Sequence, residues 1–215
     1  MRIAHCELPI LAMLGLPVST EIKKVITKKK VFEHFGADMN AERRKSFDAD
    51  IGRITLVNEV SPVSVNIAAG EDVQSFFVIL IALRKKDYDK QNVAFIAKMF
   101  GQKLLLVLEY EEKQQLAIWQ TRLILKDWAE PESLRVELTG LDLDKVWENI
   151  VAGAAGMELQ KGKTLDEQLA IQQKREKLQK DIARLEKQAW VEKQPRRKME
   201  LAQRKRALQS ELEAL

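Results

Sequence analysis

The 215-residue sequence is poor in the residues that hold small secreted domains and metal centres together. Its one cysteine, Cys6, cannot form an internal disulfide, and its two histidines are not spaced to build a structural zinc site with that cysteine. No apolar run approaches the roughly 18 residues that span a bilayer. We therefore expect a cytoplasmic protein with no membrane segment, no metal and no cofactor.

The N-terminus carries a weak signal-peptide pattern. Residues 8–16 are mostly apolar and follow Arg2. However, Glu7 precedes this stretch and no small-residue cleavage site follows it. We reject a signal peptide and interpret residues 1–12 as an N-terminal extension before a domain that starts at Met13.

The rest of the chain has the patterns of a folded protein with helices first and strands later. Hydrophobic residues make up 46% of it. Residues 76–83 are continuously apolar, as in a central strand that is covered on both faces. Capping residues and turn residues delimit the other elements. The predicted helices cover residues 19–26, 27–36, 40–50, 89–100 and 142–151, and the predicted strands cover residues 54–60, 63–67, 76–83, 103–110, 114–119, 123–125 and 134–138.

The order of these elements determines the fold class. Only one predicted helix, at residues 89–100, lies between strands, so the repeated strand–helix alternation of a doubly wound sheet is missing. We predict an α+β fold with a mixed, mostly antiparallel sheet of five or six strands and flanking helices. The predicted organisation is a globular domain at 13–156, a hinge at 157–163 and a C-terminal helical hairpin at 164–215.

The hairpin prediction rests on a heptad pattern. Residues 163–215 contain no glycine and one proline, Pro195. Apolar residues recur there at alternating steps of three and four, which is the spacing of a coiled-coil seam. Thr164 and Glu167 have the spacing of a capping box, so the first helix should begin near Thr164. The seam consists of Ile171, Leu178, Ile182, Leu185 and Ala189 before the proline and Leu201, Leu208, Leu212 and Leu215 after it.

Two arrangements of this region are possible. Folding back at Pro195 pairs residues whose numbers sum to about 390, such as Ile182 with Leu208. The alternative is one kinked helix that dimerises in trans, but a proline inside a helix costs about 3 kcal/mol, which favours the hairpin. The oligomeric state stays open. We expect Trp190 to cover the small Ala189 rather than to stack on bases. The candidate partner-interface residues are Leu178, Ile182, Leu185, Trp190, Leu208 and Leu212.

The positive charge of the chain lies in the tail. Residues 161–215 hold 15 Lys and Arg against 9 Asp and Glu, whereas the remainder holds 21 against 23. A basic segment near the fold-back could contact phosphates, although it could also be an ordinary solvated helix face. The candidate nucleic-acid-binding residues are Lys193, Arg196, Arg197, Lys198, Arg204 and Arg206.

A second hypothesis concerns metal-dependent hydrolysis. Glu111 and Lys113 have the Glu-x-Lys spacing of many nucleases, in which carboxylates hold Mg²⁺ and a lysine polarises the attacking water. Glu109 precedes them, and Asp87 or Asp89 could complete the set. The pattern falls in a predicted hairpin turn, however, where such residues are usually only solvated. The low-probability catalytic candidates are Asp87, Asp89, Glu109, Glu111 and Lys113.

Several short motifs occur in the order known from one family. They are Met13-Leu14-Gly15-Leu16-Pro17 with Ser19-Thr20, Lys28-Lys29-Lys30 with Phe32-Glu33, Asn66-Ile67-Ala68-Ala69-Gly70-Glu71-Asp72-Val73, Leu108-Glu109-Tyr110-Glu111, Gly140-Leu141-Asp142-Leu143-Asp144 and Trp147-Glu148-Asn149. From about Met13 to Leu215 the chain resembles a bacterial family of unknown function, DUF4391. Glu112 stands where that family has a glycine, which makes the turn there less certain.

The resemblance implies a role but no catalytic residue. The family is similar to proteins encoded beside helicases and DNA methyltransferases in restriction or phage-defence loci. It therefore implies a protein partner, a helicase or a DNA methyltransferase, and possible contact with DNA. Our leading hypothesis is a non-catalytic adaptor subunit whose body docks on that partner and whose basic hairpin contacts the partner or DNA. The alternatives are a Mg²⁺-dependent nuclease subunit and a protein that homodimerises through the tail.

Overall fold

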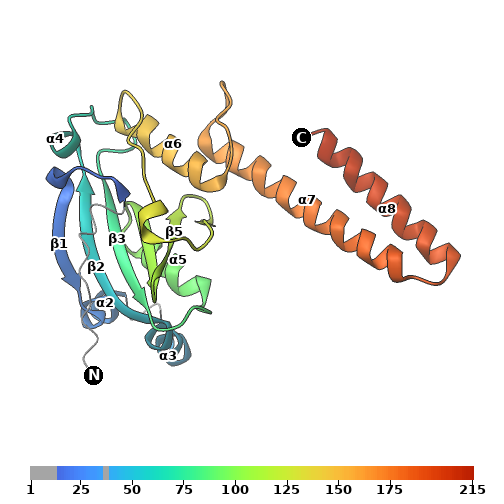
Figure 1. The fold of residues 1–215 in the computed structure, drawn as a ribbon, viewed down its shortest axis with the longest axis horizontal. Helices are drawn as coiled ribbons and strands as arrows, with labels where there is room; N and C mark the ends of the chain where they lie inside the picture. The colour runs from blue at the N-terminus through green and yellow to red at the C-terminus, as the bar shows by residue number, and fades with distance from the viewer. Residues whose placement is uncertain (1–13, 36–38) are drawn as a thin grey trace. The chain divides into compact units, whose positions relative to one another are not determined.

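The computed structural model describes residues 14–35 and 39–215 and divides the chain between Glu158 and Leu159 into two compact units (Figure 1). The first unit contains the sheet and the shorter helices, and the second contains two long helices. The predicted extension at residues 1–12 lies outside the described residues.

The first unit is built on a six-stranded sheet in which the strands follow one another in sequence order. Neighbouring strands are antiparallel except for β3 and β4, which are parallel and are joined through a helix. This arrangement confirms the predicted α+β class. The strands are β1 (Glu21–Ile26), β2 (Ile51–Val60), β3 (Phe76–Leu83), β4 (Lys103–Tyr110), β5 (Lys113–Trp119) and β6 (Leu123–Leu125).

Side-chain caps fix the starts of the longer helices in this unit. The side chains of Asn40, Asp89 and Asp142 accept hydrogen bonds from backbone N–H groups two or three residues further on, at 2.8 to 2.9 Å. These caps match the predicted helix starts. The helical elements are η1 (Val18–Thr20), α2 (Lys28–Phe35), α3 (Ala41–Asp50), α4 (Pro62–Val65), α5 (Lys90–Met99), η3 (Pro131–Ser133) and α6 (Leu143–Ala155).

The central strand β3 is buried on both faces, as its continuous apolar sequence predicted. Ile79 and Ile81 belong to a cluster that includes Phe47 of α3 and Ile96 of α5. Successive side chains of a strand point to opposite faces, so Phe76 and Val78 lie on the other face. There the Phe76 ring packs on Trp147 of α6 at 5.4 Å between ring centroids. The helices therefore cover both faces of the sheet.

Three sequence predictions are wrong in detail. Residues 21–26 form the edge strand β1 instead of a helix, since their β-branched side chains pair along β2. Residues 62–65 form the short helix α4 instead of a strand, because Pro62 follows a Ser61–Ser64 capping box. Residues 134–138 form no strand; Val136 N donates to Leu14 O, and Leu134 N donates to Pro131 O.

The second unit is the predicted helical hairpin. It consists of α7 (Leu165–Val191) and α8 (Pro195–Glu213), which pack against each other. The Thr164 side chain accepts from Glu167 N, and the Glu167 side chain accepts from Thr164 N, so the capping box is complete. Pro195 is the first residue of α8, where its missing N–H leaves no helical hydrogen bond unmade. Within the described residues, no helix is long and apolar enough to cross a bilayer.

Candidate nucleic-acid interface at the hairpin turn

Two ion pairs between α7 and α8 show the register of the hairpin. Lys174 Nζ lies 2.8 Å from Glu211 Oε1, and Lys205 Nζ lies 2.7 Å from Glu186 Oε1. The residue numbers of these pairs sum to 385 and 391, close to the predicted 390. The two helices therefore run antiparallel, with Gln194 and Pro195 at the fold-back.

The predicted seam is also the covered face of each helix. Leu178 and Leu185 are buried, and Ile182, Leu208 and Leu212 are half-buried. No residue of α8 is fully buried. These five side chains, which were candidate partner contacts, stabilise the hairpin itself and leave a partner only their partly exposed edges.

The turn between the helices is short and ordered by its own side chains. The helix α7 ends at Val191, and three residues connect it to α8. The Glu192 carboxylate accepts a hydrogen bond from Gln194 N at 2.9 Å. Because α7 ends and α8 begins here, the side chains near the turn are held on regular helix geometry close to the fold-back.

Positive charge is concentrated beside this turn. Residues 193–206, called here the basic turn segment, hold seven Lys and Arg and a single acid, Glu200. The rest of residues 161–215 is balanced, with eight basic and eight acidic residues. The charge excess noted for the whole tail therefore belongs to this segment of 14 residues.

Most of these cations have no carboxylate partner. Lys205 is engaged by Glu186, and Arg196 lies 3.6 Å from Glu200 in a largely exposed pair, which contributes little. The other five cations are exposed and form no ion pair with any residue that the structure describes. They are Lys193, Arg197, Lys198, Arg204 and Arg206. Such groups are free to contact phosphates.

A groove of about 660 Å³ runs along one flank of this end of the hairpin. Arg197, Leu201 and Arg204 line it from α8 at helical spacing, opposite Gln188 and Val191 of α7. Its remaining lining residues are Glu192, Lys193, Gln194 and Glu200. The lining carries three cations, Lys193, Arg197 and Arg204, against two carboxylates, Glu192 and Glu200, so the groove has a small positive excess.

The structure corrects one expectation about the turn. Trp190 was expected to cover Ala189, but its side chain is 85% exposed. The reason is its position in α7, since it is one residue beyond the seam residue Ala189 and therefore about 100° around the helix. Its ring is left to solvent, and Val191 and Met199 beside the turn are exposed as well.

The nuclease candidates do not converge in the structure. Glu111 and Glu112 form the exposed two-residue turn between β4 and β5, with Glu111 in the left-handed region at φ 54°. Glu109 pairs across the strands with Gln114, whereas Lys113 pairs with Tyr110, so the side chains of Glu109 and Lys113 point to opposite faces of the sheet.

The two aspartates of the nuclease set lie elsewhere or have another role. Asp89 caps α5, and Asp87 is exposed in the loop before it. In the described part of the chain, no three His, Cys, Asp or Glu side chains are placed to hold a metal ion. The shared cleft that the nuclease hypothesis requires is therefore missing from these residues.

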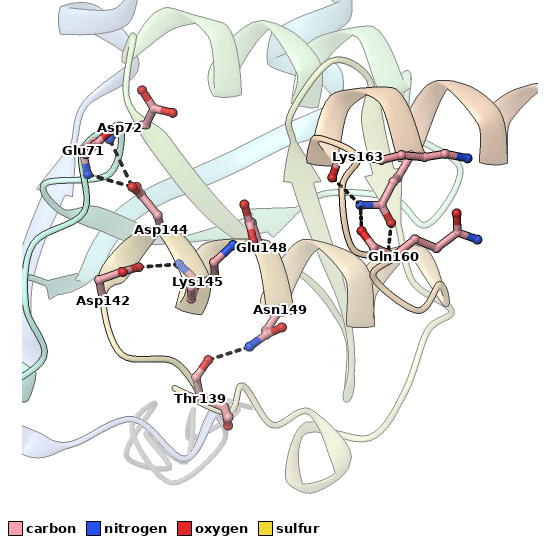
Figure 2. A network of polar contacts seen from close by, with 11 residues as sticks. Glu71, Asp72, Thr139, Asp142, Asp144, Lys145, Glu148, Asn149, Gln160 and Lys163 are labelled. Atoms are coloured by element: carbon pink, nitrogen blue, oxygen red, sulfur yellow. Dashed lines mark hydrogen bonds and ion pairs between the residues drawn. The ribbon is translucent and has the colours of Figure 1, made fainter.

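A polar cluster that our sequence interpretation missed joins two distant motifs of the first unit (Figure 2). The Asp144 carboxylate accepts hydrogen bonds from the N–H groups of Glu71 at 2.7 Å, Asp72 at 3.4 Å and Val73 at 2.7 Å. Leu143 N also donates to Ala68 O at 2.9 Å. Backbone N–H groups converging in this way form an anion-binding concavity, and here the protein's own carboxylate occupies it.

This cluster, the Asp144 seat, lowers the pKa of Asp144. Partial burial acts to raise that pKa, but the three N–H donors outweigh it and hold the carboxyl below its usual value of 3.8. The two motifs, residues 68–73 and 140–144, are visible in the sequence as segments that resemble a family. Nothing in their spacing indicated that they meet. Because its acceptors are satisfied, the Asp144 seat stabilises the fold and offers no vacant ligand site.

The sequence comparison agrees with the resemblance and extends over nearly the whole chain. Residues 14–212 match the family described as "Domain of unknown function (DUF4391)". The chain belongs to this family. Comparisons of this DUF4391 member with curated proteins and with solved structures found no match. The matched range includes both the sheet and the hairpin, so the hairpin is part of the family's architecture.

Proposed function

We propose that this DUF4391 protein is a non-catalytic accessory subunit of a DNA-acting complex and that its basic turn segment contacts nucleic acid. The observation that supports this proposal is the set of five exposed cations without carboxylate partners beside an ordered turn. Each cation that contacts a phosphate releases a condensed counterion, which favours binding at low salt.

The first unit supplies the other half of the proposed role. It has a well-packed sheet covered on both faces, and its strongest polar clusters are internally satisfied. We propose that this unit docks on a helicase or a DNA methyltransferase while the hairpin engages the nucleic acid. Co-purification of the full chain with such a purified partner tests this docking, and lack of any stable complex would contradict it.

Neutralising the basic turn segment should weaken DNA binding and flatten its salt dependence. In the variant Arg197→Gln/Lys198→Gln/Arg204→Gln, three exposed cations without a carboxylate partner are removed, and with them three proposed phosphate contacts. Since each contact contributes about 0.7 to 0.9 to the slope of log K against log salt, we expect the slope to fall by about 2 to 3. Fluorescence anisotropy with labelled oligonucleotides at several salt concentrations measures this slope.

The control variant removes the same charge elsewhere in the second unit. Lys161, Lys163 and Lys180 are exposed and lie outside the basic turn segment. Replacing all three with glutamine should change the slope by less than about 1, which is the share of one contact. Equal effects of the two triple variants would show general electrostatic attraction and would contradict a local interface.

Measuring the mass in solution separates a monomer from a dimer formed through the hairpin.

A further inference from the structure

Trp190 is an exposed aromatic platform within the positive surface at the turn. Its side chain is 85% exposed, whereas Trp147 is buried and Trp119 and Trp128 are partly buried. Among the described residues, seven large hydrophobic side chains are exposed, and three of them, Trp190, Val191 and Met199, lie within a few residues of the turn. Tryptophan is enriched at binding surfaces, and its gathering with two other exposed apolar side chains favours such a surface here.

The ion pair between Glu186 and Lys205 places Lys198 on the same flank of the hairpin as Trp190. Trp190 follows Glu186 by four residues, so the two share one face of α7. Lys198 precedes Lys205 by seven residues, or about two turns, so these two share one face of α8. Because Glu186 and Lys205 meet at 2.7 Å, Trp190 and Lys198 lie on the same flank, nearer the turn. An unpaired cation therefore lies on the flank of the exposed ring.

We propose that Trp190 stacks on an unpaired base while Lys198 and its basic neighbours follow the phosphates on either side. The ligand of the turn is then single-stranded nucleic acid. This inference rests on the proposed function and narrows it. In a duplex the base faces are stacked on one another and are inaccessible, whereas every base of a single strand offers a face to an aromatic ring.

Charge favours nucleic acid over a protein as the occupant of this surface. Aromatic, methionine and arginine side chains also gather at protein interfaces, so exposure of Trp190 alone does not decide the matter. The basic turn segment, however, holds seven cations against one carboxylate. A phosphate chain complements such a segment along its whole length, and the combination of an aromatic ring with unpaired cations is that of single-strand binding surfaces.

The test compares Trp190→Ala with the wild-type chain on two ligands of equal length, a single-stranded oligothymidine of about 20 nucleotides and a duplex of about 20 base pairs. We expect Trp190→Ala to weaken binding of the single strand by about 5- to 100-fold and to change duplex binding by less than about twofold. Trp190→Phe, which keeps a ring, should recover most of the loss. Tryptophan fluorescence should be quenched by oligothymidine in the wild type and not in Trp190→Ala.

Controls and outcomes separate this inference from the proposed function. Val191→Ala removes the neighbouring exposed apolar side chain and should leave both affinities unchanged. If the triple variant in the basic turn segment loses affinity for oligothymidine while Trp190→Ala does not, the basic interface stands and the stacking inference fails. Equal losses on single strand and duplex also overturn the stacking inference. If Trp190→Ala disrupts only a complex with a protein partner, the surface is a protein interface and the inference is wrong.

Discussion

Replacing Gly70 with alanine should lower the free energy of unfolding of the first unit by about 3 kcal/mol. A Cβ atom at Gly70 would lie 2.1 Å from Asp144 Oδ1 and 2.2 Å from its Cγ. The carboxylate could not stay in place, and the N–H groups of Glu71 and Val73 would lose their acceptor. Each hydrogen bond to a charged group contributes about 1.5 to 3 kcal/mol, and two short ones are lost.

A double-mutant cycle tests this mechanism. Asp144→Ala alone should destabilise by about 2 to 3 kcal/mol, because it removes the same acceptor. Adding Gly70→Ala to Asp144→Ala should then lower the free energy of unfolding by less than about 1 kcal/mol further, since the carboxylate that the new Cβ atom would clash with is already gone. Urea denaturation followed by circular dichroism measures all four proteins. If the losses of unfolding free energy in the two single variants simply add in the double variant, the clash between residue 70 and Asp144 does not cause the destabilisation.

The hairpin could be predicted in detail because its signals are local. Heptad spacing, the Thr164 capping box and the position of Pro195 each depend on residues a few positions apart. The pairing rule that sums residue numbers to about 390 then follows from the fold-back, and the ion pair between Glu186 and Lys205 agrees with it. In the same way, the uninterrupted apolar run at residues 76–83 was sufficient to place β3.

The errors arose where neighbours far along the chain decide the structure. Ile22, Val25 and Ile26 fit either a helix or a strand, and pairing with β2, about 30 residues later, selects the strand. The alternation of Val63 and Val65 resembles a strand, but the capping box at Ser61 starts a helix and leaves Val63 97% exposed. Short apolar runs of this kind cannot be assigned from their period alone.

The polar contacts of the sites were predictable only in part. The cations of the basic turn segment were named from the sequence because they are neighbours in it. The Asp144 seat was not, because residues 71–73 and Asp144 are about 70 positions apart and neither segment carries a hydrophobic period. The exposure of Trp190 was predicted wrongly, because a heptad pattern identifies the side chains that face the partner helix and does not specify the direction of the residue that follows them. Exposure of single side chains beside a seam depends on the angle around the helix.

The last prediction concerns Asp50, whose carboxylate is buried where α3, α5 and the end of β3 meet. Its side chain is 1% exposed. Its Oδ2 accepts from Asp89 N and from Asn92 Nδ2, both at 2.8 Å, and Lys85 Nζ lies 2.8 Å from its Oδ1. The carboxylate thus joins the end of one helix to the start of another.

Removing this carboxylate should destabilise the first unit strongly. In Asp50→Ala, Asn92 Nδ2 and Asp89 N lose their acceptor, and Asn92 is itself buried. Each buried group left without a partner costs about 1 to 3 kcal/mol, so we expect a loss of about 3 kcal/mol. Lys85→Gln should lose less than about 1.5 kcal/mol, because the Lys85 side chain is half exposed and the space that its ammonium leaves admits water to Asp50 Oδ1.

The pH dependence identifies the charged form as the stabilising one. Burial acts to raise the pKa of Asp50, but hydrogen bonds from Lys85, Asp89 and Asn92 outweigh it, so the pKa is lower in the folded protein than its usual 3.8. A lowered pKa in the folded state contributes stability that is fully present above pH 3.8 and is lost as the pH falls below that value. We expect Asp50→Asn to depend less on pH in this range than the wild type.

Asp144 titrates in the same range, so the two carboxylates must be separated. The pKa of Asp144 is also lowered, and it contributes with the same sign. Urea denaturation between about pH 2.5 and 5 should give a smaller pH slope for Asp50→Asn and for Asp144→Asn than for the wild type, and the smallest slope for the double variant. Asp50 and Asp144 share no hydrogen-bond partner and belong to helices that cover opposite faces of the sheet, so the two reductions should add. A wild-type slope in Asp50→Asn would mean that Asp50 is not held as a carboxylate by Lys85, Asp89 and Asn92.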